Sequence, residues 1–492
     1  MAGLLNKKVK NFIIHLGDAM LKKTKIICTL GPASSDPDIL LQMIQAGMNI
    51  VRLNFSHGTH EEHAARIRMI REAAAKSGAS IGIIADIQGP KIRIGSLAEE
   101  PMVLTKNRPV TLSINPAKEK IKGFIYVDYP TLTQDVPVGG AIHLADGMIR
   151  LTVLETGPEE LKCRVIDGGE LTARKGVFLP GVSVNLPALM DKDRSDIEFA
   201  IKQQVDFIAV SFARKAEHIL EIRDFVQRLG GNQLLIAKIE NEEGLKNSRD
   251  IIKVSDGIMV ARGDMGVEVS LEEVPLFQKQ LIELCNSFGK PVITATEMLE
   301  SMIRNPRPTR AEVTDIAHAI LDGTDAIMLS AETAVGKYPV IAVEMMSRVA
   351  ERTEASLQYE EIMAEKKVGA APTIADAICH ATCQSALDLK AVAIICSTQT
   401  GSTARKVSKY RPQAPIIAAT PSEQVARQLA LSWGISPVVV PISDNIDSMI
   451  DVSVNAAQKT GCIKAQDLIV ITAGVLTGTP GSTNLIKVHV VD

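Results

Sequence analysis

The sequence predicts an α/β protein: a (β/α)8 TIM barrel with an inserted β-barrel lid domain and a C-terminal α/β domain. Three observations predict it. The 492 residues are too many for one hydrophobic core and suggest two to four domains. From Thr24 onward, short β-branched runs alternate with longer stretches of helical periodicity, which is typical of parallel βα units. Eight such runs precede residue 333, and eight strands close a barrel of this kind.

The composition excludes two classes of protein. An apolar share of 46%, a charged share of 23% and a net charge of -3 leave no basic surface for nucleic acid. No apolar run approaches the ~20 residues that span a bilayer. Residues 1–23 alternate charged with apolar side chains, so we expect a short amphipathic N-terminal helix and a cytoplasmic protein.

The barrel strands are expected in two parts of the chain, residues 24–88 and 187–355. In order, the runs read TKIICTL, NIVRLNF, IGIIADI, DFIAVSF, LLIAKIE, GIMVARG, PVITATE and AIMLSAE. Most of them carry a polar or charged residue at or next to their C-terminal end. The C-terminal strand ends of such barrels form the active face. We therefore expect one face to gather Arg52, Asn54, Asp86, Ser211, Lys238, Glu240, Arg262, Asp264, Thr296 and Ser330.

The insertion between the third and fourth strands covers residues 89–186. It is rich in Val, Ile and Thr with frequent Gly and Pro turns, which predicts a small β domain. The chain enters and leaves it at the catalytic face, through DIQGPKIRIG and LPGVSVNLP. This placement suits a lid that excludes water from the site.

The last part, residues 356–492, reads as a second α/β domain. A long helix around residues 340–357 precedes it, and the charged stretch YEEIMAEKK marks the boundary. Helical segments separate the expected strands AVAIIC, PIIAAT, ISPVVV, DLIVIT and LIKVHVV.

The seven cysteines are an odd number and several lie in strand-like runs, so we expect buried, reduced thiols. Cys379, His380 and Cys383 form CHATC, which could hold a metal ion. No second ligand pair follows at the spacing of a zinc site, so a packed helix face is favoured.

Two strand ends carry carboxylates, Glu240 and Asp264. Two hard oxygen ligands, with room for waters and substrate oxygens, suit Mg²⁺ or Mn²⁺ better than Zn²⁺. Lys238 lies two residues before Glu240, and the period of a strand puts both side chains on one face. Such a lysine can neutralise charge on a transferring phosphoryl group or an enolate. The alternative, a lysine–glutamate pair sealing the barrel interior, stays open from these residues alone.

Other candidates have simple structural alternatives. Arg52 and Arg93 suit a bound phosphate, although either could be a surface ion-pair partner. Thr296 stands where a strand opens into a helix, so its hydroxyl could relay a proton or cap that helix. The chain has neither a Walker A sequence nor a dinucleotide glycine fingerprint. A nucleotide site would therefore consist of scattered side chains plus a metal ion.

The ordered segments resemble one family over nearly the whole chain, the pyruvate kinases. The resemblance rests on KTKIICTLGPASSD, GMNIVRLNFSHG, DIQGPKIR, AKIENEEG, VARGDMGVE, ITATEMLESM and PRPTRAEVTDIAHAILDGTDAIMLSAETAVGKYP. It implies a magnesium-dependent glycolytic phosphotransferase that converts phosphoenolpyruvate and ADP to pyruvate and ATP. It further implies a homotetramer that a sugar phosphate or nucleotide regulates.

The same resemblance implies roles for individual residues. Arg52 would hold the phosphate of phosphoenolpyruvate, and Lys238 would stabilise the transferring phosphoryl group and the enolate. Glu240 and Asp264 would ligate the divalent ion, with a second magnesium arriving on the nucleotide. The backbone of Ala261, Arg262 and Gly263, with Thr296, would hold the substrate carboxylate. Thr296 and Ser330 would deliver a proton to the enolate. The nucleotide set would be Asn54, His57, Arg93 and Lys192, and the monovalent cation set Asn54, Ser56, Asp86 and the Ile87 carbonyl.

Two features concern regulation and ions. STQTGSTARK resembles a loop that holds an effector phosphate, through Ser397, Thr398, Thr400, Gly401, Ser402 and Thr403; an ordinary strand-to-helix turn is the alternative. Potassium-requiring relatives typically carry glutamate after Gly-Pro of the hinge motif, where this chain has Lys91. The lysine ammonium could replace the potassium charge, unless Lys91 simply points to solvent.

Two other functions remain as alternatives. A metal-dependent aldolase or lyase acting on pyruvate enolates would use the same barrel and the same carboxylates, but it leaves the lid and Lys238 without a role. A catalytically silent sensor of sugar phosphates would need only the last domain. Intact Arg52, Lys238, Glu240 and Asp264 argue against the loss of activity that this second alternative requires.

Overall fold

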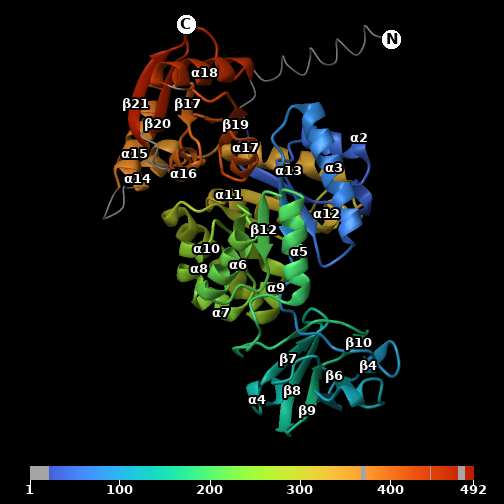
Figure 1. Ribbon diagram of the computed structural model, residues 1–492. Coiled ribbons are helices and arrows are strands. Elements are labelled where there is room, and N and C mark those ends of the chain that lie inside the picture. The colour runs from blue at the N-terminus through green and yellow to red at the C-terminus, as the bar shows by residue number, and fades with distance from the viewer. Residues whose placement is uncertain (1–21, 367–372, 444, 475–482) are drawn as a thin grey trace, which may run out of the picture. The chain divides into compact units, whose positions relative to one another are not determined.

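The computed structural model in Figure 1 describes residues 22–366, 373–443, 445–474 and 483–492. The helix expected at the N-terminus falls on residues outside these ranges. The chain forms two compact units, described separately below. The first unit holds the chain up to Ala85, Gln203–Ile208 and the chain from Ile282 onward; the second holds Asp86–Lys202 and Ala209–Leu281.

The predicted parallel barrel is present and closed, in the strand order β1-β16-β15-β14-β13-β12-β3-β2. Every predicted barrel strand is confirmed. Their residues are mostly apolar and almost entirely buried, as strands covered on both faces require. The strands are β1 (Lys25–Thr29), β2 (Ile50–Asn54), β3 (Gly82–Asp86), β12 (Phe207–Val210), β13 (Leu234–Ile239), β14 (Gly257–Ala261), β15 (Val292–Ala295) and β16 (Ala326–Leu329).

Helices follow the strands, and local capping defines where several begin. Thr59 and Thr309 each accept a hydrogen bond from the backbone three residues on, and Glu62 and Glu312 reciprocate. The main helices of the barrel region are α2 (Pro37–Gln45), α3 (His60–Ser77), α5 (Asp191–Lys202), α6 (Ala216–Arg228), α7 (Glu242–Lys246), α8 (Ser248–Val254), α9 (Arg262–Glu268), α10 (Val274–Phe288), α11 (Arg310–Leu321), α12 (Ala331–Ala334) and α13 (Pro339–Glu354).

The insertion is a separate β-rich domain with its own core, as predicted (Figure 1). Its strands form a six-stranded sheet, β11-β7-β8-β9-β5-β6, and a two-stranded sheet, β10-β4, instead of one continuous barrel. The edge strands β11 and β6 do not pair with each other. Residues 93 and 94 lie between them and form one isolated bridge to each side, Arg93↔Gly176 next to β11 and Ile94↔Val127 next to β6. The strands are β4 (Met102–Leu104), β5 (Pro109–Ser113), β6 (Phe124–Tyr126), β7 (Ala141–Leu144), β8 (Ile149–Thr156), β9 (Glu160–Asp167), β10 (Gly169–Leu171) and β11 (Val177–Phe178).

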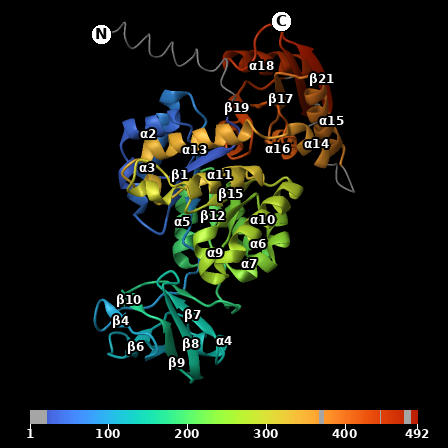
Figure 2. The same cartoon turned by 180° about the vertical axis from the view of Figure 1, so that it is seen from behind.

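The C-terminal domain is a five-stranded sheet of order β19-β18-β17-β20-β21, in which only β21 is antiparallel. Figures 1 and 2 show α18 on one face of the sheet and α15 with α16 on the other, and each face packs its own core. The elements are α14 (Tyr359–Glu365), α15 (Ile374–Asp388), β17 (Ala393–Ser397), α16 (Ser402–Lys409), β18 (Ile416–Thr420), α17 (Glu423–Leu429), β19 (Ile435–Val439), α18 (Ile446–Lys459), β20 (Leu468–Gly474) and β21 (Thr483–Val490).

The CHATC segment lies on α15 and faces this core. Cys379 and Cys383 are buried against α16, and the His380 ring packs edge-on against Tyr410. No group of three metal-ligating side chains occurs in the ranges that the structure describes. The contacts of Cys379, Cys383 and His380 make the segment part of the apolar packing, as favoured above.

One buried ion pair joins barrel and C-terminal segments within the first unit. Arg411 donates two hydrogen bonds to Asp325, from Nη1 to Oδ1 at 3.0 Å and from Nη2 to Oδ2 at 2.9 Å. The same carboxylate accepts the backbone N–H groups of Val292 and Trp433. Nearby, Lys25 Nζ donates to the Ile435 carbonyl at 2.6 Å, and burial lowers the pKa of Lys25 to about 7. Asp325 thus has a partner for both of its oxygens, as a buried carboxylate requires.

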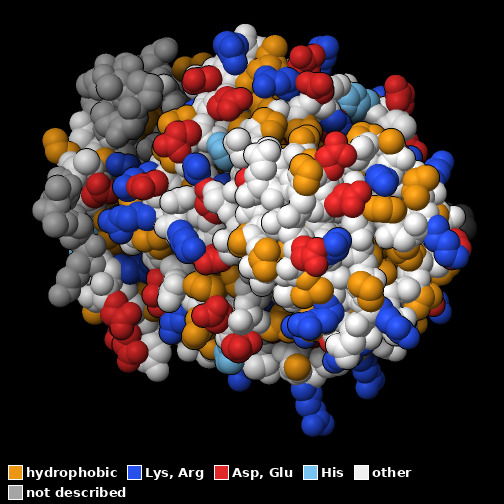
Figure 3. All heavy atoms as spheres, turned by 90° about the horizontal axis from the view of Figure 1, so that it is seen from below, with side chains coloured by type: hydrophobic (Ala, Val, Ile, Leu, Met, Phe, Trp, Pro, Cys, Tyr) orange, Lys and Arg blue, Asp and Glu red, His pale blue; other side chains and the backbone are white. Residues whose placement is uncertain are grey.

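Two surface properties agree with the composition. On the face drawn in Figure 3, Lys and Arg side chains are interspersed with Asp and Glu side chains, so no field of one sign covers it. Within the described ranges, none of the helices has the length and apolar character needed to cross a membrane.

Candidate active site

In the second unit, Lys238 is the centre of a buried polar network at the end of β13. Its Nζ lies 2.9 Å from Glu240 Oε1, 3.2 Å from Asp86 Oδ1 and 2.8 Å from Ser211 Oγ. Only a tenth of the Lys238 side chain is exposed, and the two carboxylates are almost fully buried. The network therefore holds an ammonium ion in a fixed position with little water around it.

Ser211 and Phe212, directly after β12, hold this network together. The Ser211 hydroxyl donates to the Ile87 carbonyl at 2.7 Å while accepting from Lys238. Phe212 has a φ of 54°, which is rare for a bulky residue, and its N–H donates to Glu240 Oε2 at 2.7 Å. Gly89 makes the close approach possible, since a Cβ there would lie 2.9 Å from the Ser211 carbonyl oxygen.

Glu240 sits where its negative charge needs a cation. Burial raises its pKa; Lys238 opposes the shift, and the nearby Asp264 carboxylate adds to it. Asp264 itself lies in the first turn of α9, with about a third of its side chain exposed (34%). A buried and an accessible carboxylate on neighbouring strand ends are a donor set that fits a hard divalent ion with open positions for substrate oxygens.

Lys91 turns inward to the Asp264 carboxylate. Its Nζ lies 3.5 Å from Asp264 Oδ1 and faces the rings of Phe178 and Phe212 at 5.0 and 5.7 Å from their centroids. One fifth of the side chain is exposed. The alternative in which Lys91 points to solvent is therefore wrong: the ammonium is held by a carboxylate and two aromatic faces.

The remaining predicted residues of the second unit have ordinary local partners. Ala261, Arg262 and Gly263 form the N-terminal end of α9, as expected, and the Arg262 side chain is buried against Gln278. In the insertion, Arg93 donates to the Arg174 carbonyl at 2.9 Å. On α5, Lys192 pairs with Asp196 at 2.6 Å.

In the first unit, β2 and the loop after it carry four predicted residues in one short segment. Arg52 pairs in register with Thr29 of β1, and its Nη1 donates to the Thr29 hydroxyl at 3.1 Å. After it, Asn54 Oδ1 accepts the Ser56 N–H at 3.1 Å, and the His57 side chain is exposed. The parallel register thus presents Arg52 level with the end of β1.

Thr296 does not open a helix, which corrects the expectation above. Thr296 and Glu297 both have positive φ, 69° and 58°, and the next helical turn begins only at Glu300. Two consecutive left-handed residues cannot continue a helix. The Thr296 hydroxyl donates to the Ala295 carbonyl at 2.7 Å, so the capping alternative is wrong.

Ser330 follows β16 and is positioned by a residue that the sequence analysis did not single out. The fully buried Glu332 accepts the N–H groups of Ser330 at 2.7 Å and Leu299 at 3.0 Å. Within the described ranges the Ser330 hydroxyl is buried and makes no hydrogen bond. Glu332 thus ties the end of β16 to the segment after β15.

The proposed effector loop joins β17 to α16. Gly401 has a φ of 80° and caps the start of α16, and its N–H donates to the Thr398 hydroxyl. The Thr403 hydroxyl is buried and lies 2.7 Å from that of Thr483, whereas Thr400 is exposed. Arg405, which was not singled out from the sequence, donates from Nη2 to the Thr400 carbonyl at 2.8 Å.

Comparison with known proteins gives these residues their context. The chain matches the family described as "Pyruvate kinase, barrel domain" over residues 21–343 and "Pyruvate kinase, alpha/beta domain" over residues 376–489. The chain belongs to the pyruvate kinase family. It is 50% identical to a pyruvate kinase of Geobacillus stearothermophilus, with 96% of this chain and 81% of the relative covered. A pyruvate kinase of Staphylococcus epidermidis is 48% identical, with the same two shares covered.

A solved structure agrees. A pyruvate kinase from Cryptosporidium parvum aligns with a TM-score of 0.91 at 38% identity, covering 98% of this chain and 97% of that one. As a pyruvate kinase, the protein is a phosphotransferase that converts phosphoenolpyruvate and ADP to pyruvate and ATP, the final step of glycolysis. The comparisons give no support to the aldolase or lyase alternative.

Proposed function

We propose that Lys238 stabilises the transferring phosphoryl group and the enolate, and that Glu240 and Asp264 hold the divalent ion. The observation that carries this proposal is the ammonium of Lys238, fixed by three partners beside the buried Glu240 carboxylate. Phosphoryl transfer needs positioned charge more than covalent help. The test is the kinetics of a Lys238 variant, with kcat and the KM for phosphoenolpyruvate measured separately.

When bound, Mg²⁺ or Mn²⁺ would neutralise charge on the phosphate and enolate oxygens. The protein's own residues prepare this position. Phe212 N–H and Lys238 fix both oxygens of Glu240, while Asp264 stays accessible from the first turn of α9. Arg52 binds the substrate phosphate, and the α9 N-terminus at residues 261–263, with Thr296, binds the carboxylate.

The proton that converts enolate to pyruvate passes, in this proposal, through the Thr296 and Ser330 side chains. Ser330 supports the assignment because its hydroxyl is buried without a hydrogen bond to any described residue. A hydroxyl in that state is ready to bind a water molecule or a substrate oxygen. Asn54, His57, Arg93 and Lys192 contact the nucleotide, which brings the second magnesium.

Potassium is expected to be dispensable, because the Lys91 ammonium already stands next to Asp264. We expect near-full activity in potassium-free buffer at matched ionic strength, and potassium activation gained in Lys91→Glu. Initial rates with potassium or tetramethylammonium chloride measure this, since equal ionic strength removes differences in screening. Asn54, Ser56, Asp86 and the Ile87 carbonyl remain as a weak monovalent site. Activation of the unmodified enzyme by about an order of magnitude would contradict the proposal.

A phosphorylated metabolite, either a sugar phosphate or a nucleotide, is expected to activate the enzyme through the loop of residues 397–403. Ser402→Ala with Thr403→Ala should raise the half-activating concentration about tenfold, because two hydroxyls at a helix N-terminus are lost to the phosphate. Basal kcat should stay unchanged. Activation curves with a panel of sugar phosphates and AMP measure the effect.

Two controls separate binding from structure in this experiment. Thr403→Ala alone reports the loss of its bond to Thr483, and Ser422→Ala removes a helix cap elsewhere in the same domain. An unchanged activation curve in the double variant would exclude the loop as the effector site.

The remaining assignments follow the family. We propose a cytoplasmic homotetramer, with barrel residues 24–88 and 187–355, a lid of residues 89–186 and a regulatory domain of residues 356–492. Sedimentation of the purified protein tests the assembly.

A further inference from the structure

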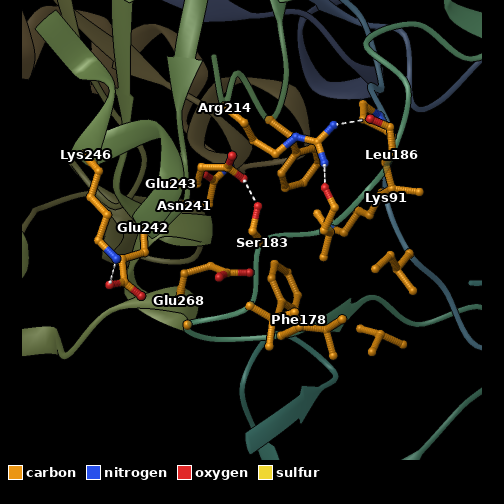
Figure 4. A pocket seen from close by; sticks show the side chains of 18 residues that line it. Lys91, Phe178, Ser183, Leu186, Arg214, Asn241, Glu242, Glu243, Lys246 and Glu268 are labelled. Atoms are coloured by element: carbon orange, nitrogen blue, oxygen red, sulfur yellow. Dashed lines mark hydrogen bonds and ion pairs between the residues drawn. The ribbon is translucent and has the colours of Figure 1, made fainter. Parts of the chain in front are cut away.

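A cavity of about 200 Å³ lies in the second unit, between the return segment of the β-rich insertion and the barrel (Figure 4). The catalytic and substrate-binding residues named above do not line it, and Lys91 is its only residue from the proposed ion sites. Much of its wall is apolar and includes Ile92, Val177, Phe178, Leu179, Val182, Leu186 and Phe212. Its volume is below that of drug-sized sites, so it suits a small molecule.

Most charged groups around this cavity are already paired. Lys246 Nζ lies 2.6 Å from Glu242, and Glu243 accepts from Ser183 at 3.2 Å while pairing with Lys215 at 3.3 Å. Arg214 donates to the Val184 and Leu186 carbonyls at 2.7 and 2.5 Å, as the dashed lines in Figure 4 show. Lys91 is held by Asp264. These lysines and glutamates therefore already have charged partners, whereas both bonds of Arg214 go to neutral carbonyl oxygens and its buried Nε has no hydrogen bond to a described residue.

Among the carboxylates that line the cavity, Glu268, at the end of α9, is the exception. Its carboxylate has no hydrogen bond or ion pair to any residue that the structure describes, and in Figure 4 it points toward Phe178 and Ser183. Burial raises its pKa to about 7, and the Glu242 and Asp264 carboxylates add to the shift. A half-buried carboxylate without a partner is stabilised by a cation that enters its surroundings.

We propose that this cavity binds a small primary ammonium compound with an apolar or aromatic body. The ammonium pairs with Glu268, and the body packs against Phe178, Val182 and Phe212. Glu268 selects this class, because its carboxylate has no partner among the described residues, whereas Glu242 and Glu243 are paired with Lys246 and Lys215. The apolar wall favours binding of a hydrophobic body, because burying it removes apolar surface from water. A metal ion or a free ammonium ion has no such body.

An occupant would connect the insertion to the barrel. Phe178 and residues 181–186 belong to the return segment, whereas Glu268 belongs to α9, whose first turn carries Asp264. The insertion already contacts α9 there, since His143 Nδ1 lies 2.8 Å from the Val267 carbonyl. A bound amine therefore adds a contact across the same junction, and we expect it to change kcat without competing with phosphoenolpyruvate.

The test uses 4-fluorophenethylamine as the probe, followed by 19F NMR on the full-length protein at pH 8, where Glu268 is ionised. Saturable binding is expected. Affinity should fall about tenfold in Glu268→Gln, which keeps the shape and removes the charge. It should stay unchanged in Glu272→Gln, which removes an exposed carboxylate just after α9. The neutral isostere 2-(4-fluorophenyl)ethanol should bind the unmodified protein about tenfold more weakly.

Three results would overturn the proposal. One is equal affinity of amine and alcohol for the unmodified protein, a comparison that needs no variant to fold. Another is an unchanged affinity in Glu268→Gln. The last is displacement of the probe by saturating phosphoenolpyruvate, which would place it in the active site. None of these binding measurements depends on catalytic activity. The proposal of an amine site and the proposed catalytic roles can therefore be refuted independently of each other.

Discussion

Replacing Lys238 with methionine is expected to lower kcat by about a thousandfold while changing the KM for phosphoenolpyruvate far less. Methionine keeps much of the length of the side chain and removes the ammonium that lies between Glu240, Asp86 and Ser211. A fixed charge in a site with little water acts most strongly on the charge that develops during transfer. Steady-state rates in a coupled assay with phosphoenolpyruvate and ADP measure both constants.

Lys246→Met is the matched control. Lys246 forms an exposed ion pair one helical turn from Glu242, a contact worth little energy, so its removal should leave kcat unchanged. Thermal melting of both variants checks that they fold, because Lys238→Met leaves two buried carboxylates without their cation. A large rise in KM with kcat intact would make Lys238 a binding residue instead.

Glu240→Gln and Asp264→Asn are each expected to reduce activity by about a hundredfold or more, and removal of divalent metal should abolish it. Both changes keep the side-chain shape and remove one anionic ligand. The loss should be larger for Glu240, because the Lys238 and Phe212 contacts hold it in a single orientation, whereas Asp264 is partly exposed. Mn²⁺ binding, measured by electron paramagnetic resonance, provides a readout independent of turnover.

Glu242→Gln provides the comparison for both variants. Glu242 lies two residues after Glu240, pairs with Lys246 and takes no part in the proposed ligand set. It should bind Mn²⁺ as the unmodified protein does. Near-normal turnover in the double variant Glu240→Gln with Asp264→Asn would show that the metal assignment is wrong.

The sequence predicted the fold well because its signals are local and repeated. Each barrel strand is a short apolar run with a polar residue at its C-terminal end or directly after it, and burial on both faces keeps such runs apolar. The closure of the insertion was less predictable. Whether its edge strands pair depends on segment 93–94, which forms only isolated bridges with either side. Amino-acid composition does not indicate whether a segment forms a single β-bridge or a full ladder of strand hydrogen bonds.

For the candidate site, the period of β13 correctly put Lys238 and Glu240 on the same side, and their contact at 2.9 Å follows from it. What holds them was not predictable. Ser211 was expected only as a polar strand end, and Phe212 reads as an apolar residue in the sequence. Its left-handed backbone, which turns the N–H to Glu240, arises from tertiary contacts. The prediction that Thr296 opens a helix was wrong for the same reason, because nothing in the run ATEM indicates two consecutive residues with left-handed backbone.

The pair between Asp325 and Arg411 is expected to couple the unfolding of the two parts of the first unit that it joins. Asp325 directly precedes β16 and also accepts the N–H of Trp433, so the barrel strands of the first unit and the C-terminal domain share one buried carboxylate. If one part unfolded alone, a buried charge in the other part would lose its partner. The free-energy cost of such a loss is about 3–5 kcal/mol. A calorimeter would therefore record a single cooperative heat-absorption peak for these two segments, with no plateau in which one has unfolded before the other.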